Sequence, residues 1–290
     1  MRKVTVGLLA HLLGKQPYAK LAAGVAAAGF DYVQLALSKA ISDIDFSLGK
    51  LSPGLANEIG GAFARHGVGI AVLGCYASWI DPDDEIFRYN VERFKEHLRH
   101  ARHFGAPIVA TEVGMPEDRA NEKIYWERLH RALEELVEEA ERWGTVIGLE
   151  AAQGHLIDTA EKLAETIERF PSSCVGVVLD PCNLLNPQNF GDRERIVREA
   201  FRLLGPRIVS AHAKDLKRTP DGKLEETGAG FGDFGLYPLF WELLERQKPY
   251  CFVTLEAVGR TDFAAVSAFV REGRARARAA PDGTSPATPK

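Results

Sequence analysis

Cysteine is scarce in this chain, and the chain shows none of the sequence features that mark membrane-spanning, secreted or nucleic-acid-binding proteins. The four cysteines, Cys75, Cys174, Cys182 and Cys251, lie far apart and form no Cys-x-x-Cys pair. This pattern argues against a disulfide framework and favours reduced thiols in the cytoplasm. No run of about 18 apolar residues predicts a membrane span, and residues 1–6 lack the apolar core of a signal peptide. The net charge of −4 provides no basic surface for nucleic acid.

Eight short apolar runs, rich in β-branched residues, recur along the chain. They occupy residues 4–10, 32–37, 68–73, 108–111, 146–149, 175–179, 208–211 and 251–255. Continuous apolar runs are typical of strands that are covered on both faces. An amphipathic helical segment follows each run. These segments are residues 18–28, 53–65, 85–104, 122–143, 159–169, 193–204, 237–246 and 262–272.

This alternation predicts an α/β fold in which crossover helices connect parallel strands. Eight units predict a closed TIM (β/α)8 barrel, a single domain over residues 1–272, with a doubly wound open sheet as the alternative. Residues 273–290 begin with alternating Arg and Ala and continue with Pro, Gly, Thr and Ser. We expect them to form a disordered C-terminal tail. The connections 39–51 and 216–236 are long loops after strands, on the face where barrel enzymes place their chemistry.

Four consecutive predicted strands end in an ionisable side chain: Glu150, Asp180, His212 and Glu256. A barrel would bring all four to one mouth. Three converging carboxylates repel one another and raise their own pKa values unless a cation lies between them. Three oxygen donors and one imidazole favour Mn²⁺, Mg²⁺ or Co²⁺ over structural Zn²⁺. We therefore predict that these residues bind one divalent metal ion, with Mn²⁺ expected and Mg²⁺, Co²⁺, Zn²⁺ or Fe²⁺ as alternatives.

The sequence around these residues resembles the xylose isomerase-like TIM barrels, the sugar-phosphate isomerase/epimerase superfamily that includes ketose 3-epimerases and inosose dehydratases. The resemblance covers roughly residues 4–272 and depends on four phrases: Leu149-Glu150, Asp180-Pro181-Cys182-Asn183, His212-Ala213-Lys214-Asp215 and Leu255-Glu256. It implies a single metal held by the four residues above. It also implies that Glu150 and Glu256 are the catalytic acid and base on opposite faces of the substrate. Where this chain has Asn183, the epimerase branch often has a substrate-contacting histidine, and relatives often carry an acid at the position of Gln34.

The leading interpretation is a metal-dependent sugar isomerase or epimerase that acts on a ketose or related keto-polyol through an enediolate. The nearest alternative is a keto-inositol dehydratase-type lyase, because the same enediolate can expel a β-hydroxyl group. An abasic-site endonuclease is disfavoured by the acidic net charge. A non-catalytic sugar-binding barrel is disfavoured because a pure binding protein needs no pair of opposed glutamates.

Four further residues are candidates for binding the sugar substrate: His155, Asn183, Lys214 and Arg218. Each has a simpler interpretation. His155 is also consistent with a surface histidine, Lys214 with an ion pair to a nearby acid such as Asp215, and Arg218 with a solvated side chain. Asn183 can donate and accept hydrogen bonds but cannot transfer a proton at neutral pH.

Three residues near the ends of the first and third predicted strands, His11, Tyr76 and Trp79, are candidates for a wall against which a sugar stacks. Loop anchoring is an equally good interpretation of the two aromatic residues. The family resemblance suggests a homodimer or homotetramer, although no predicted helix shows an unusual apolar face.

Overall fold

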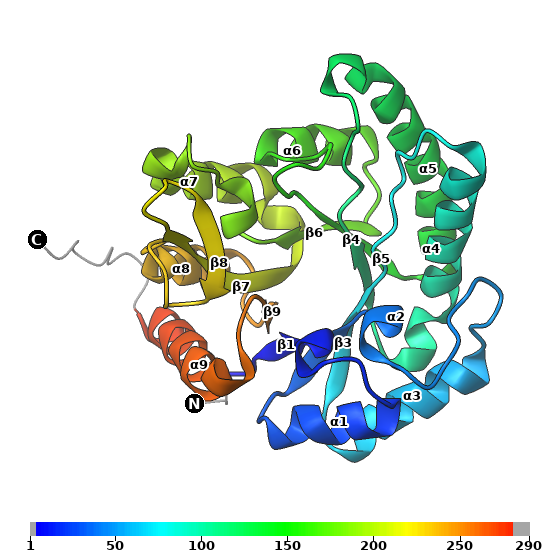
Figure 1. The fold of residues 1–290 in the computed structure, drawn as a ribbon, viewed down its shortest axis with the longest axis horizontal. Helices are drawn as coiled ribbons and strands as arrows, with labels where there is room; N and C mark the ends of the chain where they lie inside the picture. The colour runs from blue at the N-terminus through cyan, green and yellow to red at the C-terminus, as the bar shows by residue number, and fades with distance from the viewer. Residues whose placement is uncertain (1–3, 281–290) are drawn as a thin grey trace, which may run out of the picture.

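The computed structural model describes residues 4–280, in which a closed parallel barrel is surrounded by helices (Figure 1). The barrel strands pair in the order β6-β5-β4-β3-β2-β1-β9-β7, and β6 also pairs with β7, which closes the ring. The strands are β1 (Gly7–Leu9), β2 (Tyr32–Leu35), β3 (Gly69–Gly74), β4 (Ile108–Thr111), β5 (Val146–Glu150), β6 (Val175–Leu179), β7 (Ile208–Arg218) and β9 (Phe252–Leu255). The predicted TIM barrel is confirmed, and the open-sheet alternative is wrong.

Nine α-helices lie between and after the strands within residues 4–280. Seven match predicted segments to within one residue, one short helix was not predicted, and the last helix runs past residue 272. The helices are α1 (Tyr18–Ala27), α2 (Leu37–Ala40), α3 (Pro53–Arg65), α4 (Asp84–Phe104), α5 (Glu122–Trp143), α6 (Ala160–Arg169), α7 (Arg193–Leu204), α8 (Tyr237–Gln247) and α9 (Phe263–Ala279). The Ser52 side chain caps α3 by accepting a hydrogen bond from the Leu55 N–H, with Pro53 at the first helical position. Gly105 ends α4 in the left-handed conformation. No helix within residues 4–280 is long and apolar enough to cross a membrane.

Alternation along the strands divides the buried side chains into two sets. One set, including Val33 and Val109, packs in the large core against the helices. The other forms a small cluster of Tyr32, Ala71, Val72, Ile108, Ala110 and Val178. Successive strand residues point to opposite faces, except where a register shift interrupts the pairing of β2 and β3 at Ala71, so this second set fills the barrel interior. Glu150, His212 and Glu256 have the same parity as the interior positions of their strands and lie nearer the carboxyl end, so they sit at the mouth.

Part of the long connection after residue 215 is a β-hairpin, where the sequence indicated only a loop. Strand β7 continues to Arg218 and pairs antiparallel with β8 (Leu224–Gly228). The Asp215 carboxylate then fixes the glycine-rich segment that follows by accepting hydrogen bonds from the N–H groups of Gly230 and Phe234. A Cβ at Gly232 would lie 2.4 Å from Asp215 Oδ1, so the close approach requires glycine there.

The expectation of disorder from residue 273 is wrong for residues 273–279, which continue helix α9. Arg274 is fully buried, and its Nε donates a 2.6 Å hydrogen bond to Glu245 Oε1 on α8. Its other nitrogens donate to the carbonyls of Thr5 and Cys251, just before β1 and β9. Arg278 also pairs with Glu245. These contacts attach the helix to the amino-terminal end of the barrel, which composition alone could not indicate. The rest of the predicted tail, residues 281–290, lies outside the described residues.

Candidate metal centre

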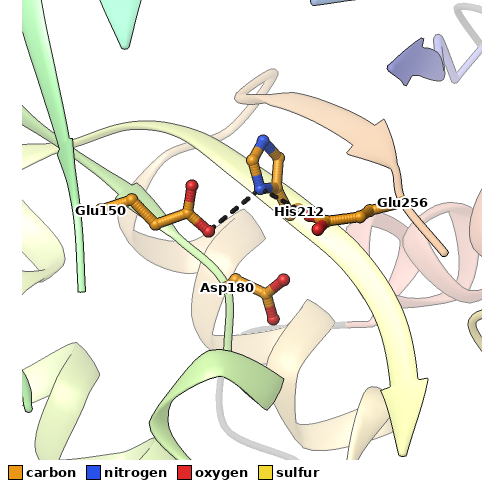
Figure 2. A group of neighbouring side chains, drawn as sticks. All are labelled: Glu150, Asp180, His212 and Glu256. Atoms are coloured by element: carbon orange, nitrogen blue, oxygen red, sulfur yellow. Dashed lines mark hydrogen bonds and ion pairs between the residues drawn. The ribbon is translucent and has the colours of Figure 1, made fainter. Parts of the chain in front are cut away.

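The four residues predicted to bind metal come together at the carboxyl ends of β5, β6, β7 and β9 (Figure 2). Each offers one ligand atom, and these atoms lie within 4.8 Å of one another. His212 Nδ1 lies 3.2 Å from Glu150 Oε1 and 3.1 Å from Glu256 Oε2. Figure 2 shows the two glutamates reaching the imidazole from opposite sides, with Asp180 below it. The register explains this convergence, because four neighbouring strands each carry one such side chain near the end of their barrel pairing.

Burial and charge perturb every member of this cluster. Burial raises the pKa of Glu150, although His212 counteracts it. Burial also raises the pKa of Asp180, to about 6, against the effect of Lys214. Burial would raise the pKa of Glu256, but hydrogen bonds and charge from His212 and Lys214 lower it to about 2. Burial would lower the pKa of His212, yet the two glutamates raise it well above its ordinary value. The cluster therefore carries an excess of buried negative charge.

Asp180 shows that the residues present fit a cation. Its Oδ1 accepts hydrogen bonds from the N–H groups of Cys182 and Asn183, at 2.7 and 3.3 Å. Its Oδ2 is buried and accepts no hydrogen bond within the described residues. The nearest positive charge, Lys214 Nζ, is 3.6 Å from that oxygen. A buried carboxylate oxygen without a donor is costly, and a divalent ion bound by the four side chains would satisfy it.

Lys214 is held by carboxylates but not by the expected one. Its Nζ lies 2.6 Å from Glu226 and 3.2 Å from Glu256. Burial would lower the pKa of the ammonium, but Asp180, Glu256 and Glu226 raise it above its usual value. The predicted pairing with a nearby acid is confirmed, but Asp215 is not the partner, because adjacent strand residues point to opposite faces. Glu226 lies on β8, a strand of the hairpin that the sequence pattern does not predict.

Two of the other predicted substrate-binding residues lie beside the cluster. Asn183 Nδ2 donates a 2.7 Å hydrogen bond to Glu150 Oε1, so this residue orients a predicted catalytic carboxylate. His155 is partly exposed, and its Nδ1 accepts a 3.3 Å hydrogen bond from the Gly114 N–H. Burial lowers the pKa of His155, although Glu150 acts in the opposite direction. Asn183 and His155 therefore line the Glu150 side of the mouth.

The structure places Arg218 outside the cluster. It is exposed at the end of β7, with its guanidinium 4.6 Å from the centre of the Phe190 ring. Its backbone N–H donates to Asp233. Within the described residues it makes no hydrogen bond or ion pair with the four ligand candidates, so it belongs to the hairpin rather than to the candidate centre.

Gln34 is a site residue whose role the sequence did not reveal. It is 1% exposed at the end of β2. Its Oε1 lies 2.9 Å from His212 Nε2, and its Nε2 donates a 3.0 Å hydrogen bond to the Tyr76 hydroxyl. Its position at a strand end was visible in the sequence, but the partners come from β7 and from the segment after β3. Tyr76, predicted as an apolar wall, therefore contributes a polar group to the mouth.

The family profile of the xylose isomerase-like TIM barrels matches residues 22–280. The chain belongs to this family. No curated protein matches it at the level of sequence similarity. The membership confirms the predicted family and accounts for the closed barrel with its mouth at the carboxyl ends of the strands.

Solved structures share the fold of this family member at low sequence identity. A D-tagatose 3-epimerase-like protein aligns with a TM-score of 0.73 and 19% identity, covering 94% of this chain and 98% of the other. A xylose isomerase-like TIM barrel protein from Mycobacterium smegmatis, in complex with magnesium, gives 0.71 and 18%, covering 96% and 98%. The IOLI protein with a bound zinc atom gives 0.67 and 18%, covering 94% and 96%.

Proposed function

We propose that this protein is a metal-dependent isomerase or epimerase that acts on a ketose or a related keto-polyol. The observation that carries the proposal is the buried cluster of Glu150, Asp180, His212 and Glu256, whose ligand atoms lie within 4.8 Å of one another. The proteins of similar fold named as sugar epimerases, or crystallised with magnesium or zinc, support it. Three oxygen donors and one nitrogen favour Mn²⁺ among the candidate ions.

The four side chains would hold the ion, and two of them would also move protons. A divalent cation in such a site polarises a substrate carbonyl and the neighbouring hydroxyl group, which acidifies the C–H bond between them. Glu150 and Glu256 lie on opposite sides of His212. One carboxylate would accept that proton, and the other would return one to the opposite face. An enediolate of the substrate lies between these two proton transfers.

A neighbouring residue would orient each of the two glutamates. Asn183 holds Glu150 through a 2.7 Å hydrogen bond, and Lys214 holds Glu256 at 3.2 Å. Fixing both carboxylates keeps their oxygens aligned with the reacting carbon, which is the geometric requirement for efficient proton transfer. His155, on the Glu150 side of the mouth, would contact a hydroxyl group of the sugar.

The test is solvent deuterium exchange into a panel of ketoses and keto-inositols, followed by mass spectrometry and NMR, with Mn²⁺ present. Deuterium at a carbon next to the carbonyl, together with a new epimer or aldose–ketose isomer, is the expected result. Loss of water from a keto-inositol would instead favour the lyase that the same cluster could support. Absence of exchange, isomer and elimination across the panel, in protein shown to bind Mn²⁺, would refute the enzymatic proposal.

A further inference from the structure

The hydrogen bond between Gln34 and His212 has a direction that the surroundings determine. His212 Nδ1 faces the carboxylates of Glu150 and Glu256 at 3.2 and 3.1 Å. If Nδ1 binds an ion, the imidazole proton is on Nε2, and if the ring is doubly protonated, Nε2 carries a proton as well. In both states the Nε2–H donates across the 2.9 Å contact to Gln34 Oε1.

The direction of this bond fixes the next one. With its oxygen accepting from His212, the Gln34 amide can present only its NH₂ group to Tyr76, and it does so at 3.0 Å. The Tyr76 oxygen therefore acts as an acceptor toward Gln34. Among residues 4–280, no oxygen accepts a hydrogen bond from the Tyr76 hydroxyl. Its hydrogen is left to point elsewhere.

The surroundings of the Tyr76 ring leave the side chain partly open. Gly74 leaves room for the ring, because a Cβ there would lie 3.2 Å from Tyr76 Cε2. The ammonium of Lys39 lies 3.8 Å from the ring centre and covers one face. The side chain is partly exposed, and burial and the charges of Glu112, Glu150 and Glu256 raise its pKa well above the ordinary value. Tyr76 is therefore a neutral phenol at the mouth.

We propose that Gln34 is a positioning residue that links the predicted metal ligand His212 to Tyr76, and that Tyr76 donates its hydroxyl hydrogen to an oxygen of the substrate. The amide is essential to this arrangement. A carboxylate at position 34 would accept from His212 Nε2–H and from the Tyr76 hydroxyl together, and the hydrogen would be withdrawn from the mouth. Position 34 would thus decide whether this wall of the site offers a donor or an acceptor to the sugar.

The direction of the Tyr76 hydroxyl can be measured without a substrate. Full-length protein containing ¹³Cζ-tyrosine is prepared with Mg²⁺, which is diamagnetic, in equal parts H₂O and D₂O. A hydroxyl hydrogen open to solvent exchanges fast and gives one averaged Cζ signal, whereas a hydrogen held by the protein gives two signals. We expect one signal for Tyr76 in the wild type and two in Q34E, with the signal assigned from its absence in Y76F. Two signals in the wild type, or one in Q34E, would overturn the proposal.

The link to His212 is tested by titrating Mn²⁺ alone, by calorimetry. We expect Gln34→Leu to lower the Mn²⁺ affinity by about 10–100-fold, the usual effect of losing the partner of a metal-bound histidine. Q34E should keep the Mn²⁺ affinity of the wild type, because a carboxylate also accepts a hydrogen bond from His212 Nε2–H. Y76F should also leave the Mn²⁺ affinity unchanged. Equal affinity in Q34L and the wild type, with both folded by circular dichroism, would show that Gln34 does not orient His212.

The contact with substrate depends on the proposed function and has its own test. With the best ketose of the exchange panel, Y76F and Q34E should each lower kcat/KM by about threefold to tenfold, the value of one hydrogen bond. The double variant should lose no more than either single variant, because both remove the same donor. An additive loss would refute the shared role. If no panel sugar reacts, the proposed function fails while the NMR and Mn²⁺ results still decide the hydrogen-bond chain.

Discussion

Two buried charge clusters lie at opposite ends of this barrel, and they differ in how their charges are satisfied. At the amino-terminal end, Arg274 and Arg278 share Glu245, and the remaining Arg274 donors reach backbone carbonyls. At the mouth, three carboxylates surround His212, and Asp180 Oδ2 accepts no hydrogen bond in the described residues. The first cluster is closed and stabilises the fold, whereas the second leaves an excess of negative charge available to a cation.

Substitution of Glu256 should have the largest effect, and it should act on catalysis rather than on folding. In E256Q the side chain can no longer accept a proton, so we expect kcat/KM to fall by about 10²–10⁴-fold, the usual contribution of a general acid or base. Steady-state kinetics with the best panel ketose would measure this. The control is Glu225→Gln, an exposed acid on β8, which should leave kcat/KM unchanged. Wild-type turnover in E256Q would contradict the assigned role.

Substitution of Arg274 should act on folding rather than on the metal site. R274A leaves Glu245 buried without its closest partner, so we expect the free energy of unfolding to fall by about 3–5 kcal/mol. Urea denaturation measures this change, and calorimetry of the folded protein should show an unaltered Mn²⁺ affinity. Arg276→Ala removes an exposed arginine from the same helix and should have almost no effect. Equal stability of the two variants would mean that the closed cluster contributes nothing.

Removing a charge from the mouth should stabilise the metal-free protein. Burial raises the pKa of Asp180 from 3.8 to about 6, so the folded chain holds this proton more tightly than the unfolded chain. The contribution of Asp180 to stability must therefore fall as pH rises from about 4 to 6, by up to about 3 kcal/mol. We expect D180N to be more stable than the wild type at pH 7 without metal, and to lack this pH dependence. Urea titrations at pH 4 and 7 in a chelator test this, and a less stable D180N at pH 7 would contradict it.

Metal addition should have the smallest effect on stability. This effect should depend on the cluster at the mouth and not on the cluster around Glu245. Mn²⁺ at about 100 times its dissociation constant would add about 2.7 kcal/mol to the wild type, a rise of a few degrees in Tm. D180N should lose most of this rise, because one ligand is missing, while R276A should keep it. Differential scanning calorimetry with and without Mn²⁺ provides the comparison. An equal rise in D180N would place the ion elsewhere.

The same contrast explains how much of the molecule could be predicted from the sequence. Glu150, Asp180, His212 and Glu256 were predictable because a parallel barrel must bring the ends of its strands to one mouth. Arg274 was not, because alternating Arg and Ala has the composition of a disordered tail, and only the tertiary partner Glu245 makes its burial favourable.

Partners across the mouth were also beyond the reach of the sequence. Glu226 lies on an antiparallel strand without an apolar run, so no periodic signal marked it as a neighbour of Lys214. The hydrogen bond from Asn183 to Glu150 joins two different strand ends. Which residues end a strand follows from the local pattern, but the direction in which each side chain turns depends on the packed structure.

Strand β7 restricts where this chain can change length. His212 and Lys214 face the candidate metal centre, and Asp215, on the other face, holds the glycine-rich segment. Because side chains alternate along a strand, one residue inserted before His212 would turn all three to the wrong face. The turn at residues 219–223 is free of that constraint. We expect insertions and deletions among natural relatives to collect in this turn, where the rim of the barrel mouth can change while the predicted metal ligands stay in register.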